Sequence, residues 1–176
     1  MNRQGLYRYK NYWPRIAENV FIAPGARIIG RVEIGEAASV WFNTVIRGDV
    51  NEVKIGPYTN IQDGCTLHEE DDAPLTIGER VTIGHNAIIH GCTIGKGALI
   101  GMGAIILNKA VVGENAVVAA GSLVVQGQEI PPGHLAMGSP AKIIRALTPE
   151  ESKEFQRAAE NYRRRAREYS ENTPEP

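Results

Sequence analysis

The sequence predicts an all-β fold, a parallel β-helix shaped as a triangular prism, followed by one C-terminal α-helix. Two patterns predict the prism: aliphatic residues recur every six positions from Ile22, and a small or β-branched residue usually stands four positions after each of them. A third pattern, apolar residues at three- and four-residue spacing after Thr148, predicts the helix. A six-residue period fits neither a helix nor a simple strand meander and is typical of hexapeptide β-helix repeats.

The aliphatic positions keep the six-residue period except at three places. The spacing gains three residues after Ile46, gains four after Leu67 and loses one after Ile89. Three units close a coil of eighteen residues, so the seventeen units correspond to between five and six coils, with these side chains pointing inward. The seventeen positions are Ile22, Ile28, Ile34, Val40, Ile46, Ile55, Ile61, Leu67, Ile77, Ile83, Ile89, Ile94, Ile100, Ile106, Val112, Val118 and Val124.

The small residues are expected at the tight corners between the faces of the prism, with Cys65 and Thr93 at two of them. Glycine often follows the aliphatic residue directly, as at Gly56 and Gly78. The two cysteines, Cys65 and Cys92, form no paired motif, so a disulfide scaffold is not indicated and both are expected to be packing residues.

The pattern divides the chain into five segments. Residues 1–19 carry aromatic residues without a clear period and are expected to pack on the body as a lead-in. Residues 20–130 form the β-helix, and the Gly- and Pro-rich residues 131–147 are expected to form an exit loop. The helix is predicted over 148–170, and 171–176 are expected to form a frayed tail.

Thr148 is expected to cap this helix, with Pro149 at the first helical position and Glu151 completing a capping box.

Composition restricts the partners and the compartment. The chain has 176 residues, 43% hydrophobic and 22% charged, as expected for one soluble domain. A formal net charge of −1 gives no bulk attraction to nucleic acid or to an anionic membrane. No apolar run approaches the roughly 20 residues of a membrane span. We therefore expect a cytoplasmic protein without nucleic-acid or membrane partners.

Three of the four histidines lie within the repeats, and their register suggests a metal site. With the faces numbered in chain order from Ile22, Ile46, Leu67 and Ile89 fall on the second face in successive coils. Arg47, His68 and His90 directly follow these residues and should form one outward column. Neighbouring coils lie about 4.8 Å apart, so two imidazoles in this column can bind one ion.

His85 follows Ile83 on the first face and lies near a corner, with Gln62 and Asp63 in the corresponding place one coil earlier. In a rigid prism this corner is badly placed to reach the second-face column of its own chain, but it can reach that of a neighbour. The sequence therefore predicts a homotrimer with metal sites at the subunit interfaces, ligated by His68, His90 and His85. Three protein ligands leave a fourth zinc position open, as in catalytic sites.

These motifs resemble the gamma-class carbonic anhydrases and their close relatives over roughly residues 10–170. The resemblance rests on Arg47-Gly-Asp49, on Asn60 to Asp63, on His68, and on His85 and His90 with their glycines. It implies a left-handed β-helix, a homotrimer, and zinc, with Fe²⁺ or Co²⁺ as alternatives. The implied reaction is the reversible hydration of CO2 to bicarbonate by hydroxide at the metal.

The resemblance also implies roles for further residues. Gln62 is expected to orient the hydroxide, and Arg47 and Asp63 are expected to form an intersubunit salt bridge, with Asp49 also at the trimer contact. Glu69, in the acidic run that follows His68, is a candidate proton shuttle. A solvated acidic turn is the alternative interpretation of this run, which continues through Glu70, Asp71 and Asp72.

Three other functions remain open from the sequence. A hexapeptide acyltransferase typically uses one catalytic histidine and an acyl-CoA groove, so the in-register pair His68 and His90 argues against it. A different metal-dependent hydrolase, such as a thioesterase-like enzyme, would use the same ligands. A metal-stabilised scaffold would bind the ion without turnover.

Overall fold

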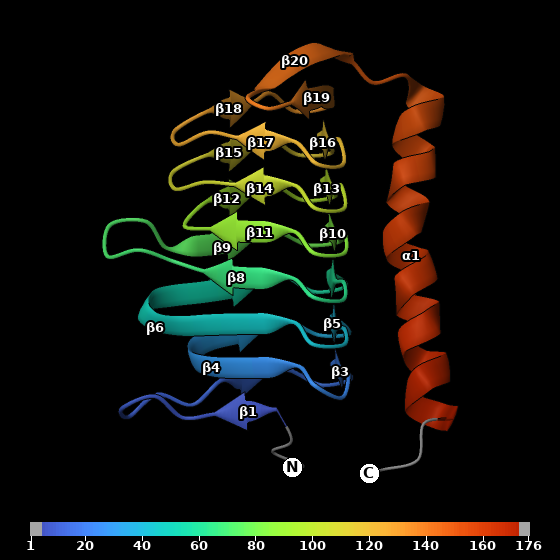
Figure 1. The fold of residues 1–176 in the computed structure, drawn as a ribbon. Coiled ribbons are helices and arrows are strands. Elements are labelled where there is room, and N and C mark those ends of the chain that lie inside the picture. The colour runs from blue at the N-terminus through green and yellow to red at the C-terminus, as the bar shows by residue number, and fades with distance from the viewer. Residues whose placement is uncertain (1–4, 173–176) are drawn as a thin grey trace.

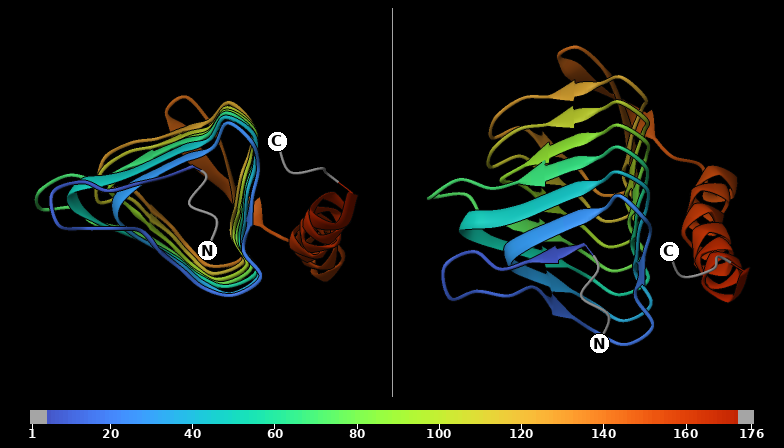
Figure 2. Two further views of the ribbon diagram at one scale, coloured as in Figure 1. Left: turned by 90° about the horizontal axis from the view of Figure 1, so that it is seen from below. Right: turned by 60° about the horizontal axis from the view of Figure 1, so that its bottom comes forward.

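Short parallel strands alternate with tight turns along most of residues 5–172, the part of the chain that this computed structural model describes. The strands stack as the rungs of a left-handed β-helix, with one long helix beside it (Figure 1). Seen along its axis, the coil is triangular (Figure 2). The predicted fold class is therefore confirmed.

Each face of the prism is a stack of hydrogen-bonded parallel strands. β4 and β6 are long enough to turn the corner from the second face to the third. The first face contains β3 (Phe21–Ile22), β5 (Ser39–Val40), β7 (Asn60–Ile61), β10 (Thr82–Ile83), β13 (Leu99–Ile100), β16 (Val117–Val118) and β19 (His134–Gly138). The second contains β1 (Leu6–Tyr7), β4 (Arg27–Ile34), β6 (Val45–Ile55), β8 (Thr66–His68), β11 (Ile88–His90), β14 (Ile105–Ile106) and β17 (Leu123–Val124). The third adds β2 (Arg15–Ile16), β9 (Leu75–Ile77), β12 (Thr93–Ile94), β15 (Val111–Val112) and β18 (Glu129–Ile130).

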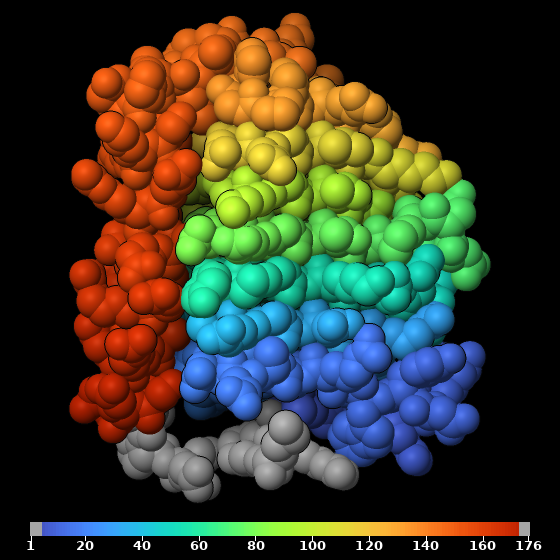
Figure 3. All heavy atoms as spheres, turned by 180° about the vertical axis from the view of Figure 1, so that it is seen from behind, coloured from blue at the N-terminus to red at the C-terminus, as the bar shows by residue number. Residues whose placement is uncertain are grey.

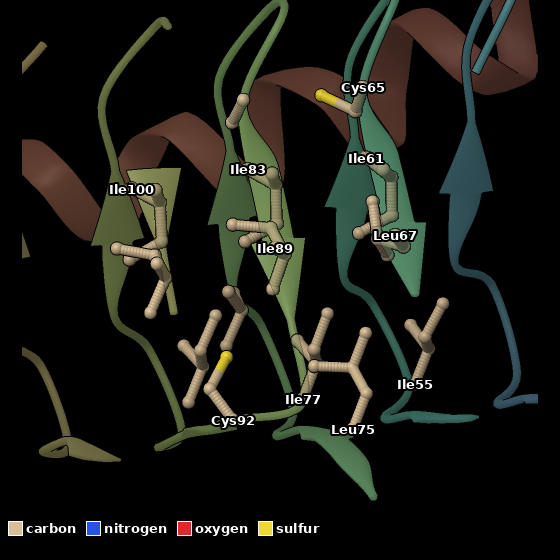
Figure 4. Packing of buried hydrophobic residues seen from close by; sticks show 14 of the residues in the cluster. Ile55, Ile61, Cys65, Leu67, Leu75, Ile77, Ile83, Ile89, Cys92 and Ile100 are labelled. Atoms are coloured by element: carbon tan, nitrogen blue, oxygen red, sulfur yellow. The ribbon is translucent and has the colours of Figure 1, made fainter. Parts of the chain in front are cut away.

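The core is a column of aliphatic side chains along the axis of the prism (Figure 4). All the predicted inward positions from Ile28 to Val124 are at most 3% exposed, and Ile22 at the lower end is partly buried. Both cysteines are free and lie in this column, and burial raises the pKa of each thiol to about 12. Burial of this continuous apolar interior is what drives the short strands to stack.

The corners explain the smaller residues of the repeat. A Cβ on Gly56 would lie 2.5 Å from the carbonyl carbon of Gly78 in the next coil, so the coils can approach this closely only without a side chain. Most predicted corner residues are buried, but Thr93 is exposed and Cys92 fills its corner instead. The prediction for Thr93 was wrong because the residue lost after Ile89 lies before this corner, which therefore comes one position earlier.

The prism extends beyond the predicted coils at both ends, to about seven turns. β1 and β2, within the predicted lead-in, pair in parallel with β4 and so begin the stack. At the other end, the predicted exit loop instead contains β19, which continues the first face, and β20 (Ala141–Ala146), which pairs antiparallel with it. Gly and Pro were interpreted as loop signals here, whereas they occupy the turns on either side of β19.

The helix α1 (Pro149–Asn172) runs along the first face, beside the stacked coils (Figures 1 and 3). The predicted capping box is present: the amide of Glu151 donates to the Thr148 hydroxyl, and the amide of Thr148 donates to the Glu151 carboxylate. The helix ends two residues later than predicted, and residues 173–176 of the predicted tail lie outside the described range.

Aromatic side chains join the helix to the prism. Tyr162 and Tyr169 each meet the ring of Trp41 edge-on, and Phe21 contacts both Trp41 and Tyr169. These contacts hold the helix against the lower coils of the first face. Within residues 5–172, α1 is too polar to cross a membrane, and the fold provides no other long helix.

Candidate metal centre

All three breaks in the repeat occur on the second face, directly after the predicted column of Arg47, His68 and His90. Four residues of β6 stand opposite one residue of β4 after Gly48, which is the predicted three-residue gain. The four-residue gain forms the turn between β8 and β9, which projects from the prism (Figure 1). The predicted alignment is confirmed, because His90 pairs directly with His68 and Leu67 with Ile46.

The two aligned histidines face each other. Nδ1 of His68 lies 3.0 Å from Nε2 of His90, and the ring centroids are 5.0 Å apart. Two ligand atoms on one tetrahedral zinc, with bonds of about 2.0–2.1 Å, are separated by about 3.3 Å. The nitrogens therefore stand close to the spacing that a shared ion requires.

The outer nitrogen of each ring has its own polar partner. Nε2 of His68 lies 3.0 Å from Oδ1 of Asp49 and 3.2 Å from Oε2 of Glu69. Nδ1 of His90 lies 2.5 Å from Oδ1 of Asn108. These oxygens are acceptors, so each neutral ring carries its hydrogen on the outer nitrogen.

This arrangement leaves unshared electron pairs on both facing nitrogens. At 3.0 Å these pairs repel each other unless a cation lies between them. The outer hydrogen bonds are also of the kind that orients metal-binding histidines and makes them more basic. The donor set of His68 and His90 therefore fits a borderline divalent cation such as zinc.

Arg47 forms an ion pair with Asp49, the carboxylate that contacts His68. Its guanidinium lies 2.6 Å from both carboxylate oxygens of Asp49. Burial alone raises the pKa of Asp49, but hydrogen bonds from Arg47 and His68 outweigh it and hold that pKa below its usual value. Asp49, His68 and Glu69 place potential ligand atoms within 4.8 Å of one another. Because Asp49 is already paired with Arg47, we interpret this group as an ion-pair network that orients His68.

Glu69 does not belong to a solvated turn, because its side chain is fully buried. The solvated-turn interpretation holds for its neighbours Glu70, Asp71 and Asp72, all of which are exposed. Lys109 pairs with Asp72 at 2.5 Å and so ties this turn to a later coil.

His85 lies at the opposite corner of the second face. Its Nδ1 is 2.8 Å from a carboxylate oxygen of Asp63, and its Nε2 is 3.2 Å from the hydroxyl of Tyr162 on α1. Its backbone amide donates to Oε1 of the buried Gln62. Asp63 and Gln62 therefore hold His85 from the previous coil, as their register predicted.

Two further residues that contact the histidines, Asn108 and Tyr162, were not predicted from the sequence to do so. Asn108 lies in an ordinary turn of a later coil, and only the stacking of β14 on β11 brings it to His90. Helix periodicity places Tyr162 on the packing face of the helix without indicating a polar contact, and the docking of α1 brings its hydroxyl to His85. Burial raises the pKa of this phenol above its ordinary value.

The coiled fold and the repeat together define a hexapeptide-repeat protein. The family described as bacterial transferase hexapeptide (six repeats) matches residues 14–48, 74–107 and 91–126. A carbonic anhydrase from Geobacillus kaustophilus is 48% identical over 157 residues, which are 89% of this chain and 86% of that one. The mitochondrial gamma carbonic anhydrase 2 of Arabidopsis thaliana is 45% identical, over 85% of this chain and 56% of its own length.

Among solved structures, a hexapeptide transferase family protein from Anaplasma phagocytophilum is 45% identical. It superposes with a TM-score of 0.90 over 95% of this chain and 99% of that one. The chain therefore belongs to the gamma carbonic anhydrase-like family of hexapeptide-repeat proteins.

Proposed function

We propose that this protein catalyses the reversible hydration of CO2 to bicarbonate at zinc sites shared between the subunits of a homotrimer. The proposed ligands are His68 and His90 of one protomer and His85 of the next, and Fe²⁺ or Co²⁺ can take the place of zinc. The observation that carries the proposal is the pair of facing nitrogens, 3.0 Å apart, with both outer nitrogens held by acceptors.

The outer surfaces of the three faces support the oligomer. On the first face the outward side chains are largely covered by α1. On the third they are mostly polar and exposed, as with Glu33, Lys54 and Thr76. The second face instead presents the aliphatic row Val45, Ile88, Ile105 and Leu123, interrupted by one threonine. Ile88 is 42% exposed, so this row is the surface that a neighbouring copy is expected to cover.

The positions of the histidines support a three-fold arrangement. His85 precedes β11 and His90 ends it, so they stand at opposite corners of the second face. The chain between them turns at Asn86 and spans at most about 16 Å, and the His85 ring is held by Asp63 and Tyr162 rather than facing the His68–His90 pair. A ring of three copies that joins one corner to the opposite corner of the next would bring the two kinds of ligand together three times.

The chemistry follows from the donor set. His68 and His90, with His85 of the next protomer, would hold the zinc, which would lower the pKa of water enough to supply hydroxide near neutral pH. Gln62 is expected to orient the attacking oxygen, since Asn60 and the amide of His85 fix its side-chain amide. Arg47 is expected to exchange Asp49 for Asp63 of the adjacent protomer, which would join the subunits beside the ligands. The exposed carboxylates after Glu69 offer a route for the proton to solvent.

Metal analysis and stopped-flow CO2 hydration on one preparation test this proposal. We expect about one zinc per protomer and rapid hydration, both lost in His90→Ala. His134→Ala is the matched control, because this fourth histidine donates only to the carbonyl of Pro132 and should leave both unchanged. Sedimentation should give a trimer. Zinc-loaded trimer without hydration activity would contradict the enzymatic proposal and leave a metal-stabilised scaffold.

An acyltransferase is the second candidate, favoured by the transferase name of the solved relative. It requires binding of an acyl-CoA by protein from which metal has been removed. Acetyl-CoA titration of the zinc-free protein distinguishes the two, since the carbonic anhydrase proposal predicts no saturable binding.

A further inference from the structure

Glu69 is a charged residue with no exposed surface, directly after the proposed ligand His68. Burying a carboxylate is costly unless hydrogen bonds compensate for lost water. One oxygen, Oε1, accepts hydrogen bonds from the backbone amides of Val50 at 2.9 Å and Asn51 at 2.7 Å. These two hydrogen bonds therefore offset part of the cost of burying the Glu69 carboxylate.

These contacts join the two inserted segments of the repeat. The first segment is the insertion in β6 after Gly48, and the second is the turn between β8 and β9. Asn51 in the first segment also bonds to the second segment, because its side-chain amide donates to the carbonyls of Glu70 at 3.2 Å and Asp71 at 2.9 Å. The first segment also carries Asp49, which contacts His68. Glu69 thus holds in place the loop that supplies the other carboxylate of the site.

The second oxygen of Glu69 has no hydrogen bond. Oε2 is buried without a hydrogen-bond partner, yet it lies 3.2 Å from Nε2 of His68, whose hydrogen is directed at Asp49. A buried negative charge at this distance favours a hydrogen on Nε2 and so leaves Nδ1, the nitrogen that faces His90, without one.

We propose that Glu69 is a positioning residue that fixes His68 in its metal-binding form, rather than the proton carrier that its place in an acidic run suggests. The inference rests on the proposed function for the identity of the ligand, but not on the reaction. It requires only that His68 binds the cation through Nδ1.

Glu69→Gln, in the full-length chain, separates the two tasks of this side chain. The glutamine oxygen can still accept from both amides, whereas the charge beside His68 is lost. Glu70→Gln is the matched control, since it removes the same charge from the exposed neighbour. Glu69→Ala removes both the charge and the acceptor.

The first readout uses zinc-free protein. Hydrogen exchange should show the amides of Val50 and Asn51 protected in the wild type and in Glu69→Gln, but not in Glu69→Ala. Nitrogen-15 spectra of labelled histidine should show His68 protonated on Nε2 in the wild type, with a larger share on Nδ1 in Glu69→Gln. Glu70→Gln should match the wild type in both.

The second readout is zinc affinity, measured by competition with a chelator. We expect about tenfold weaker binding for Glu69→Gln, because outer partners of metal-binding histidines typically contribute 10–100-fold. Glu70→Gln should bind as the wild type does. Unchanged zinc affinity in Glu69→Gln, or an equal loss in both glutamine variants, would overturn the proposal.

A proton carrier gives a different pattern. Zinc affinity would then be unchanged in Glu69→Gln, and slow CO2 hydration would recover in concentrated buffer, which also overturns the proposal. If zinc-loaded wild type does not hydrate CO2, the proposed function fails, while the spectra and zinc affinities still decide the role of Glu69.

Discussion

The residue directly after the inward aliphatic lies at a corner of the prism, and its size differs between two of the corners. After the third face, the residue that follows the inward aliphatic is glycine in successive coils, including Gly56 and Gly78. After the second face, the same position holds Arg47, His68 and His90. At the glycine corner the backbones of adjacent coils touch, so no side chain fits. At the histidine corner large side chains point outward and the spacing of the repeat changes.

The difference shows how a regular scaffold accommodates a site. The two inserted segments begin directly after Arg47 and His68, whereas one residue is lost after His90. The inserted residues then supply Asp49 and Glu69, which orient His68. The insertions therefore provide the partners of His68, whereas the partner of His90, Asn108, lies in an ordinary turn of a later coil.

Alanine at both positions of the histidine corner should have the largest effect. We expect His68→Ala with His90→Ala to weaken zinc binding roughly ten-thousandfold or more, since each ligand of a zinc site contributes about 3 kcal/mol and each 1.4 kcal/mol is about tenfold. The zinc-free variant should unfold at or above the temperature of the zinc-free wild type, because the facing nitrogens no longer repel each other. Chelator competition and thermal unfolding measure the two effects, and collapse of the zinc-free fold would show that this corner is structural after all.

Alanine at the glycine corner should lower the stability of the fold and leave zinc affinity unchanged. The Cβ of Gly56→Ala would lie 2.5 Å from the backbone of the next coil. Such overpacking costs about 1–3 kcal/mol, which lowers the unfolding midpoint by roughly 2–12 °C. Calorimetry of the variant checks the fall, and its zinc affinity should equal that of the wild type. An unchanged midpoint would mean that the coils can separate at no cost.

The partner of His90 gives a smaller effect. Asn108→Ala removes the acceptor for the outer ring nitrogen, so zinc should bind about tenfold more weakly. Glu114→Ala changes the corresponding turn position one unit later and serves as control. Equal affinities in the two variants would rule out any role of Asn108 in orienting His90.

A change remote from both corners should alter stability alone. A hydrogen bond from Arg145, together with the Thr148 amide, lowers the pKa of Glu151 from 4.5 to about 2. A depressed carboxyl pKa stabilises the fold above the unfolded value and loses this effect as the pH falls toward 2. Glu151→Gln should therefore unfold at a lower temperature than the wild type at pH 7 and at the same temperature near pH 2. Zinc affinity at pH 7 should not change, and a gap that persists at pH 2 would contradict the assigned pKa.

The features that follow from the six-residue period could be predicted from the sequence. The inward column and the alignment of His68 with His90 depend only on counting residues, including the gains and losses between coils. The capping box at Thr148 and Glu151 was equally predictable, because it is a contact within one turn.

Features outside the period could not be predicted in the same way. The burial of Glu69 arises from two inserted segments that contact each other, and neither segment carries a repeat pattern. The contact between Tyr162 and His85 depends on how α1 lies on the first face, which helix periodicity does not determine. The residues around β19 and β20 contain strong turn signals, but only the stack below them provides a strand for β19 to join.

Within residues 5–172, the backbone hydrogen bonds between strands join each coil of this prism only to the coils directly above and below it. Its height can therefore change by duplication or loss of whole units of eighteen residues beyond β14, about 4.8 Å at a time, without disturbing the geometry of the histidine pair. The prism can thus change in height while the His68–His90 pair stays intact, provided that α1 still places Tyr162 beside His85.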